Sequence, residues 1–176
     1  ASYDFLSQLY NRSTFERELK SEIERSAHAK VAVLFIDVDD FKFINDRFGH
    51  SVGDEVIKYV AGCIKQRVKG SGFAGRFGGD EFVLCITDPK QIEEIESLSL
   101  DLIDELYEGY HSELANVSIN VKASIGIAFY PEHGDDSNKV VAAADEAMYF
   151  VKKNGKANYH IYQPEDSEME DLQHTL

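Results

Sequence analysis

The fold is decided by Arg76-Phe77-Gly78-Gly79-Asp80-Glu81-Phe82, a stretch in which two glycines and two carboxylates lie between two apolar segments. Both flanking segments, 73–77 and 82–86, are rich in the apolar and aromatic residues that favour strands. A glycine pair between two such segments is typical of a tight β-hairpin whose turn residues adopt positive φ. Adjacent carboxylates at a turn repel each other unless a cation lies nearby, so this hairpin predicts either a divalent-metal site or a solvated acidic turn.

A second acidic segment follows an unbroken apolar run upstream of the hairpin. Residues 31–36 are all apolar, and Asp37, Asp39 and Asp40 come directly after them. A run without polar alternation predicts a strand that is buried on both faces. If the carboxylates at its end lie beside those of the hairpin, the arrangement suits two divalent metal ions.

Together these segments resemble the GGDEF family, the bacterial diguanylate cyclases, which join two GTP molecules into cyclic di-GMP. The resemblance rests on Asp-x-Asp-x-Phe-Lys-x-x-Asn-Asp over residues 37–46, on Gly-His-x-x-Gly-Asp over residues 49–54 and on the glycine hairpin. It extends from Asp4 to Tyr162 and departs near the start, where Ser7 and Gln8 stand in place of the family's threonine and glycine.

Composition favours a single domain that does not bind nucleic acid. The chain has 176 residues, enough for one sizeable core, and a formal net charge of −14, which opposes a polyanionic nucleic-acid partner. Cys63 and Cys85 lie in apolar patterns and are expected to be buried free thiols. No apolar run is long enough to span a bilayer. We expect a cytoplasmic location, either alone or as the cytoplasmic domain of a larger, membrane-bound protein.

The predicted fold class is α+β. Helices are expected near 41–48, 52–68, 90–110 and 137–152, strands over 121–130 and 158–162, and an N-terminal helix that begins with a capping box of Ser13 and Glu16. The order βααββαβ predicts a ferredoxin-like core of the nucleotidyl-cyclase and polymerase-palm type, with a central antiparallel sheet flanked by helices. Residues 1–163 would form this domain, and 164–176 an acidic, poorly ordered tail.

The resemblance also assigns the metal ligands and the phosphate-binding groups. It implies that Asp37 and Asp80 bridge two Mg²⁺ or Mn²⁺ ions per active site, with the Val38 carbonyl as a further ligand. Glu81 would be either a metal ligand or the group that helps to deprotonate the attacking 3′-hydroxyl. Lys42 would supply positive charge to the phosphates, although an ordinary surface lysine is the alternative interpretation.

Further positions concern phosphate and base recognition. Backbone amides near Phe41, at a helix N-terminus, suit phosphate oxygens. Asn45 and Asp54 would bind the guanine edge, because a carboxylate accepts from both the N1–H and the 2-amino group. His50 either contacts the nucleotide or shapes its loop.

The C-terminal third supplies two more cations. The resemblance implies that Lys152 and Lys156 reach the triphosphate, with Lys156 standing where arginine is usual. Residues 69–72 lack the Arg-x-x-Asp motif at which product inhibits many cyclases, so we expect no product inhibition through that site.

The resulting functional prediction is an active diguanylate cyclase that works as an antiparallel homodimer of domains. Because the family motif begins at the start of the chain, we expect a sensor or dimerisation domain N-terminal to it in a longer protein. The alternative is a catalytically weak GGDEF domain that binds GTP or cyclic di-GMP and regulates an attached domain. The intact acidic and guanine-binding positions favour the first interpretation.

Overall fold

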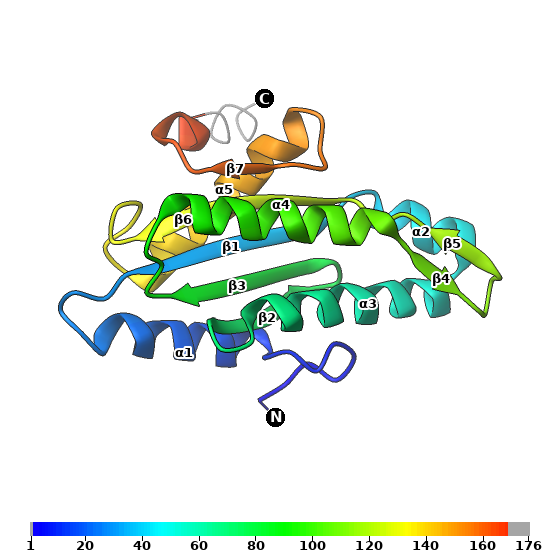
Figure 1. Cartoon of the computed structure of the whole chain (residues 1–176), viewed down its shortest axis with the longest axis horizontal. Coiled ribbons are helices and arrows are strands. Elements are labelled where there is room, and N and C mark those ends of the chain that lie inside the picture. The colour runs from blue at the N-terminus through cyan, green and yellow to red at the C-terminus, as the bar shows by residue number, and fades with distance from the viewer. Residues whose placement is uncertain (1, 169–176) are drawn as a thin grey trace.

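A five-stranded sheet forms the centre of the fold in the computed structural model, which describes residues 2–168 (Figure 1). The helices are α1 (Arg12–Glu24), α2 (Phe41–Phe48), α3 (His50–Val68), α4 (Ile92–Glu108) and α5 (Ser137–Lys153). The strands are β1 (Val31–Val38), β2 (Gly72–Gly78), β3 (Glu81–Thr87), β4 (Tyr110–Ser112), β5 (Val117–Ile119), β6 (Ala123–Tyr130) and β7 (Tyr159–Ile161). The predicted α+β class is confirmed.

The strand order of the sheet is β2-β3-β1-β6-β7, so β1 lies in the middle. It pairs antiparallel with β3 on one side and with β6 on the other. The sheet is mixed rather than wholly antiparallel, because α5 crosses over between β6 and β7 and makes that pair parallel. A separate two-stranded ribbon, β4–β5, follows α4 and was not distinguished in the sequence.

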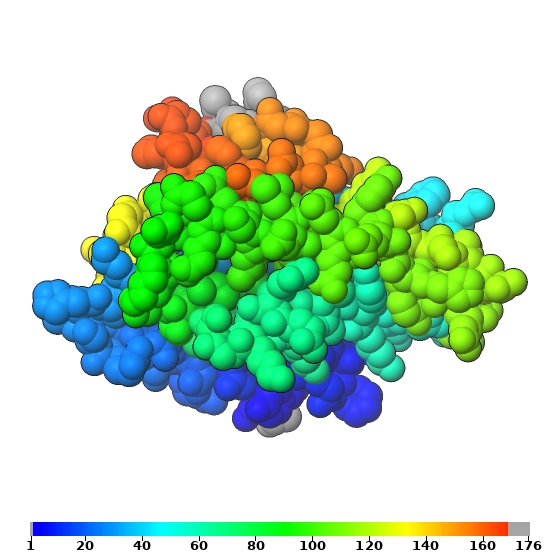
Figure 2. All heavy atoms as spheres, viewed as in Figure 1, coloured from blue at the N-terminus to red at the C-terminus, as the bar shows by residue number. Residues whose placement is uncertain are grey.

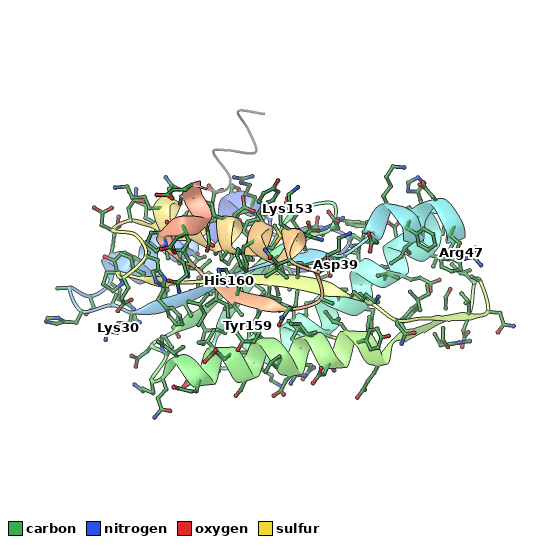
Figure 3. The ribbon with its side chains drawn as sticks, turned by 90° about the horizontal axis from the view of Figure 1, so that it is seen from above. Lys30, Asp39, Arg47, Lys153, Tyr159 and His160 are labelled. Atoms are coloured by element: carbon green, nitrogen blue, oxygen red, sulfur yellow. The ribbon has the colours of Figure 1, made fainter. Side chains whose placement is uncertain are left out.

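Helices cover both faces of the sheet, which explains the unbroken apolar run of β1. Ala32, Leu34 and Ile36 face the core formed with α3 and α4, whereas Val33 and Phe35 face the core formed with α1 and α5. Figure 3, seen from above, shows α4 on one side of the sheet and α5 on the other. In the space-filling view of Figure 2, α3 and α4 hide most of the sheet from this side. The predicted two-sided burial is therefore confirmed.

The packing of α5 on β6 has a specific cause at Gly126. A Cβ atom added there would lie 2.0 Å from the Ala144 carbonyl oxygen and 2.1 Å from the Met148 backbone nitrogen. The backbones of strand and helix therefore touch, and only glycine allows this approach. The contact fixes α5 along the strand and so fixes the place of its C-terminal end, which carries Lys152.

The start of α1 differs from the prediction. Asn11 is the N-cap, and its side-chain oxygen accepts a hydrogen bond from the Thr14 backbone nitrogen at 3.0 Å. Glu16 pairs with the Arg12 guanidinium at 2.7 Å. The capping box predicted from Ser13 and Glu16 is therefore wrong, because the N-cap lies two residues earlier than predicted and Ser13 lies in the first turn of the helix.

The predicted acidic tail begins with an ordered turn. Residues 164–168 are helical, and the buried Asp166 side chain accepts from the Gln163 backbone nitrogen at 2.8 Å and pairs with His160 at 3.1 Å. Residues 169–176 of that predicted tail lie outside the described residues. The boundary at residue 163 stays a prediction.

Two further expectations concern the interior and membranes. Cys63 and Cys85 are free and buried, as predicted. Among residues 2–168, no helix combines the length and the apolar composition that crossing a membrane requires.

Candidate active site

The glycine hairpin joins β2 to β3 and presents its two carboxylates at the turn. Gly78 pairs with Glu81, and the ladder shifts its register between Arg76 and Gly78. Neither Gly78 nor Gly79 has a positive φ, so the predicted conformational role of these glycines is wrong. The turn is instead held by Arg76, whose guanidinium donates to the Gly78 and Gly79 carbonyl oxygens at 3.2 and 2.7 Å.

The same arginine ties the hairpin to the N-terminal segment. Its Nη1 atom lies 3.1 Å from Oδ2 of Asp4, and both side chains are mostly buried. Asp4 also accepts from the Ser7 backbone nitrogen at 2.8 Å, which holds the turn over residues 4–8. Arg76 thus anchors the acidic hairpin to the N-terminal segment.

The register of β1 brings Asp37 beside that hairpin. Asp37 lies opposite Glu81 of β3 and opposite Ser124 of β6. The next residue, Val38, donates its backbone N–H to the Asp80 carbonyl oxygen at 3.1 Å. The predicted convergence of Asp37, Asp80 and Glu81 on one end of the sheet is therefore what the strand pairing produces.

The electrostatics of this carboxylate group are unfavourable without a cation. Oδ1 of Asp37 is buried and has no hydrogen-bond partner among residues 2–168. Burial, and then the neighbouring Asp80 carboxylate, raise the pKa of Asp37 to about 7 against the opposing effect of Lys152. The pKa of Glu81 is likewise raised, first by burial and then by Asp80. Burial and like-charged neighbours thus both oppose ionisation of Asp37 and Glu81.

These residues fit a divalent cation. Residues 2–168 contain no group of three or more histidine, cysteine or acidic side chains already arranged around a metal position. Even so, an orphaned buried carboxylate oxygen beside two further carboxylates is the hard oxygen donor set that Mg²⁺ prefers. Asp37, Asp80 and Glu81, with the Val38 carbonyl, would hold such an ion.

Lys152 is a cation that contacts this group through Asp37. Its Nζ atom lies 2.5 Å from Oδ1 of Asp39 and 3.5 Å from Oδ2 of Asp37. Lys156 lies four residues further along the chain, beyond the end of α5, and its Nζ atom is 2.8 Å from Oδ1 of Asp40. The structure therefore brings both predicted C-terminal lysines to the end of β1.

Lys42 is placed differently. Its side chain is 90% exposed and its Nζ atom pairs with Oδ2 of Asp46, one turn along α2, at 2.9 Å. That contact agrees with the surface-lysine interpretation. Its role in phosphate binding stays a prediction.

The predicted guanine-binding residues lie where α2 meets α3. A Cβ atom added at Gly53 would lie 1.8 Å from Oδ1 of Asn45 and 3.3 Å from the ring of Phe41. The Asn45 amide thus rests directly on the Gly53 backbone, immediately before the exposed Asp54. The packing explains why a glycine precedes this aspartate, and it places Asn45 and Asp54 next to each other.

His50 is the first residue of α3 and is exposed, following Gly49 with a φ of 93°. Phe41 is half-buried and packs against the core on the α3 side of the sheet. Its side chain therefore supports the Asn45 position rather than facing solvent.

The sequence grouped Asp39 with the carboxylates that follow the strand over residues 31–36 but gave it no individual role, whereas the structure makes it a central contact. Its side chain is fully buried, 0% exposed. It accepts from Ser124 Oγ, Lys152 Nζ and the Ala157 backbone nitrogen. These partners lie 85, 113 and 118 residues away in the chain, so no local pattern could reveal them.

Comparison with known proteins identifies the family. Residues 1–158 match the family described as "Diguanylate cyclase, GGDEF domain". Diguanylate cyclase DosC of Escherichia coli is 34% identical over 165 residues, which are 90% of this chain and 35% of DosC. Cyclic di-GMP phosphodiesterase PdeR of Escherichia coli is 30% identical over 165 residues, 94% of this chain and 24% of PdeR. This chain therefore spans about a third or less of these relatives.

A solved structure agrees in fold. The GGDEF domain of TpbB, also called YfiN, from Pseudomonas aeruginosa superposes with a TM-score of 0.91 at 30% sequence identity, covering 96% of this chain and 99% of that one. The chain belongs to the GGDEF family, as the motifs indicated.

Proposed function

We propose that this chain is the catalytic domain of a diguanylate cyclase, which condenses two GTP molecules into cyclic di-GMP and two pyrophosphates. The observation that carries the proposal is the proximity of Asp37, Asp80 and Glu81 at one end of the sheet, where Asp37 has a buried carboxylate oxygen without a hydrogen-bond partner in the described part of the chain. Burying such an oxygen costs free energy if the residue has only a structural role. A divalent cation that accompanies a nucleotide would offset this cost by binding the oxygen.

In the proposed reaction, the 3′-hydroxyl of one GTP attacks the α-phosphorus of the other, and pyrophosphate leaves. Two Mg²⁺ or Mn²⁺ ions per site would stabilise the charge that develops on the phosphoryl oxygens. Asp37 and Asp80 would hold these ions with the Val38 carbonyl. Glu81 would complete the ligand set or accept the proton of the attacking hydroxyl.

Other residues would bind and orient the substrate. Lys152 and Lys156 lie near enough to the carboxylates to contact the triphosphate, and Lys42 would reach it by leaving Asp46. The Phe41 backbone amide, at the start of α2, suits a phosphate oxygen.

The guanine would be recognised between α2 and α3. Asn45 and Asp54 offer acceptors to its edge, and His50 at the start of α3 would contact the nucleotide. Adenine presents no matching pair of donors, so ATP would leave the Asp54 carboxylate unpaired.

The symmetry of the product implies two copies of the domain. Each domain has one carboxylate group and one base-binding position, whereas cyclic di-GMP contains two equivalent phosphodiester linkages. We therefore propose that two domains face each other as an antiparallel homodimer. The relatives that match are much longer than this chain, which supports an attached sensor or dimerisation domain. A reaction on GTP also supports a cytoplasmic location.

The second candidate is a domain that binds GTP or cyclic di-GMP without efficient turnover and regulates a neighbour. It is favoured by PdeR, a relative that is named as a phosphodiesterase although 94% of this chain aligns with it.

Incubation of the purified chain with GTP and Mg²⁺, followed by chromatographic detection of cyclic di-GMP, separates the two candidates. We expect product that disappears on addition of a chelator and in Asp80→Ala. Binding of GTP without product, in a folded chain fused to a dimerising segment, would establish the second candidate instead.

A further inference from the structure

We propose that Asp39 is a positioning residue, which places both Lys152 and Lys156 for the phosphates of a bound nucleotide. The inference rests on the proposed function, because it concerns the same triphosphate. It assigns a role to a residue that touches neither the metal position nor the base. In Figure 3, Asp39 lies near the C-terminal end of α5, where Lys153 is labelled.

The first contact of Asp39 fixes the position of the Lys152 ammonium group. Oδ1 of Asp39 accepts from Lys152 Nζ at 2.5 Å and from Ser124 Oγ at 2.7 Å. The lysine side chain is only 19% exposed, so it cannot sample many positions. Without a buried anion beside it, a partly buried ammonium would turn outward to water. Asp39 therefore keeps this ammonium within 3.5 Å of the Asp37 carboxylate.

The second contact of Asp39 restrains the backbone of the segment that carries Lys156. Oδ2 of Asp39 accepts from the backbone nitrogen of Ala157 at 3.0 Å. Gly155, Lys156 and Ala157 have φ values of 107°, 62° and 50°, all in the left-handed region. Two of these are not glycine, and such a conformation persists only where the surroundings impose it. The hydrogen bond to Asp39 is one such restraint, and it directs Lys156 towards α2.

Asparagine cannot replace this carboxylate. Three donors converge on its two oxygens, and an asparagine side chain offers one acceptor oxygen and one NH₂ donor. If its oxygen faces Lys152, its NH₂ group faces the Ala157 N–H. In the other orientation the NH₂ group faces the ammonium. Asp39→Asn therefore releases one of the two lysines while it keeps the size of the side chain.

The neighbouring Asp40 provides a matched control. Its side chain is 59% exposed, and it pairs directly with Lys156 at 2.8 Å. Asp39→Asn and Asp40→Asn remove the same charge from adjacent residues. If only charge mattered, both variants would bind a triphosphate more tightly, because each removes a repulsive carboxylate. If Asp39 positions the lysines, the two variants should change the affinity for the triphosphate in opposite directions.

The experiment measures the dissociation constant of 3′-deoxy-GTP with Mg²⁺. This nucleotide lacks the attacking hydroxyl, so no condensation occurs. We expect Asp39→Asn to bind it about tenfold more weakly, the effect of losing one hydrogen bond to a charged group. Asp40→Asn should bind a few-fold more tightly, because Lys156 loses a competing counter-ion. Equal or tighter binding by Asp39→Asn would overturn the proposal.

A double-mutant cycle tests whether Asp39 acts through the lysine. In a Lys152→Met background, Asp39→Asn should cost much less affinity than it does in the natural chain. Equal losses in the two backgrounds would mean that Asp39 acts by general structural support, and would contradict the proposal.

Amide hydrogen exchange supplies a readout that needs no nucleotide. The Ala157 amide should be protected in the natural chain and exchange rapidly in Asp39→Ala, while the amides of β1 stay protected and report an intact fold. If the natural chain bound no nucleotide, the proposed function would fail, yet this exchange would still decide whether Asp39 holds the Lys156 segment. If the Ala157 amide were as protected in Asp39→Ala as in the natural chain, Asp39 would not restrain the segment that carries Lys156.

Discussion

Replacing Gly53 by alanine tests whether Asn45 contributes to base recognition. The added Cβ atom would lie 1.8 Å from Oδ1 of Asn45, and real Cβ contacts are essentially never below 3.0 Å. The asparagine amide must therefore move by more than about 1 Å, which is enough to break a hydrogen bond of normal geometry. Loss of one such bond weakens binding by about 1 kcal/mol, or about fivefold.

The stability of the domain should change in the opposite direction. Gly53 lies within α3, and alanine is favoured over glycine in helices by up to about 1 kcal/mol. The clashing atoms belong mainly to the end of a flexible side chain, so the helix itself need not shift. Gly53→Ala should therefore keep or raise the melting temperature while it weakens the binding of guanine nucleotide.

Gly62 in the same helix is the matched control. A Cβ atom added there has nothing within 4 Å, so Gly62→Ala should stabilise the helix without touching the site. The assay compares melting temperatures and dissociation constants for 3′-deoxy-GTP in the two variants. If Gly53→Ala bound the nucleotide as tightly as Gly62→Ala does, Asn45 would not recognise the base and the proposed position of guanine would be wrong.

Three further changes test the chemistry and the assembly. Asp80→Ala or Glu81→Gln should lower the rate of cyclic di-GMP formation by about a thousandfold or more in a folded domain, because a metal ligand or charge partner is lost; near-normal turnover would contradict the mechanism. Asp54→Ser should reduce the preference for GTP over ATP by about 1.5–3 kcal/mol in a competition assay, and an unchanged preference would assign base recognition to another residue. The initial rate per domain should rise with protein concentration and rise further when a leucine zipper is fused before Asp4, whereas a rate that stays constant on dilution of a monomeric chain would exclude a reaction between two domains.

The sequence predicted most of the fold because its strongest signals are local. The apolar run before Asp37 and the helical apolar stripe of α3 each identify their element without reference to the rest of the chain. The predictions are wrong where the local structure depends on a competing residue or on a segment that is distant in the chain. Asn11 takes the cap that Ser13 was expected to provide, and the parallel pairing of β7 depends on where α5 returns the chain.

The site was predictable only as a set of acidic and basic positions. Motif spacing indicated that Asp37 and the hairpin carboxylates are close, and strand pairing produces that proximity. The motif spacing could not show that Arg76, rather than the conformation of the glycines, holds the turn. No sequence pattern predicts that a guanidinium donates hydrogen bonds to two backbone carbonyl oxygens. Nor could the motif spacing show the contacts of Asp39, since its three donors come from β6, α5 and the segment before β7.

The pairing of the lysines explains how an acidic chain can bind a polyanion. Lys42, Lys152 and Lys156 each contact a carboxylate in the structure. A triphosphate that arrived alone would compete with those carboxylates for the lysines and would add negative charge close to them. Divalent ions that accompany the triphosphate would remove this penalty, because the orphaned oxygen of Asp37 and the neighbouring Asp80 and Glu81 carboxylates would then have cations beside them. Binding of nucleotide and of metal should therefore be strongly cooperative in this domain, and the net charge of −14 becomes compatible with a nucleotide substrate.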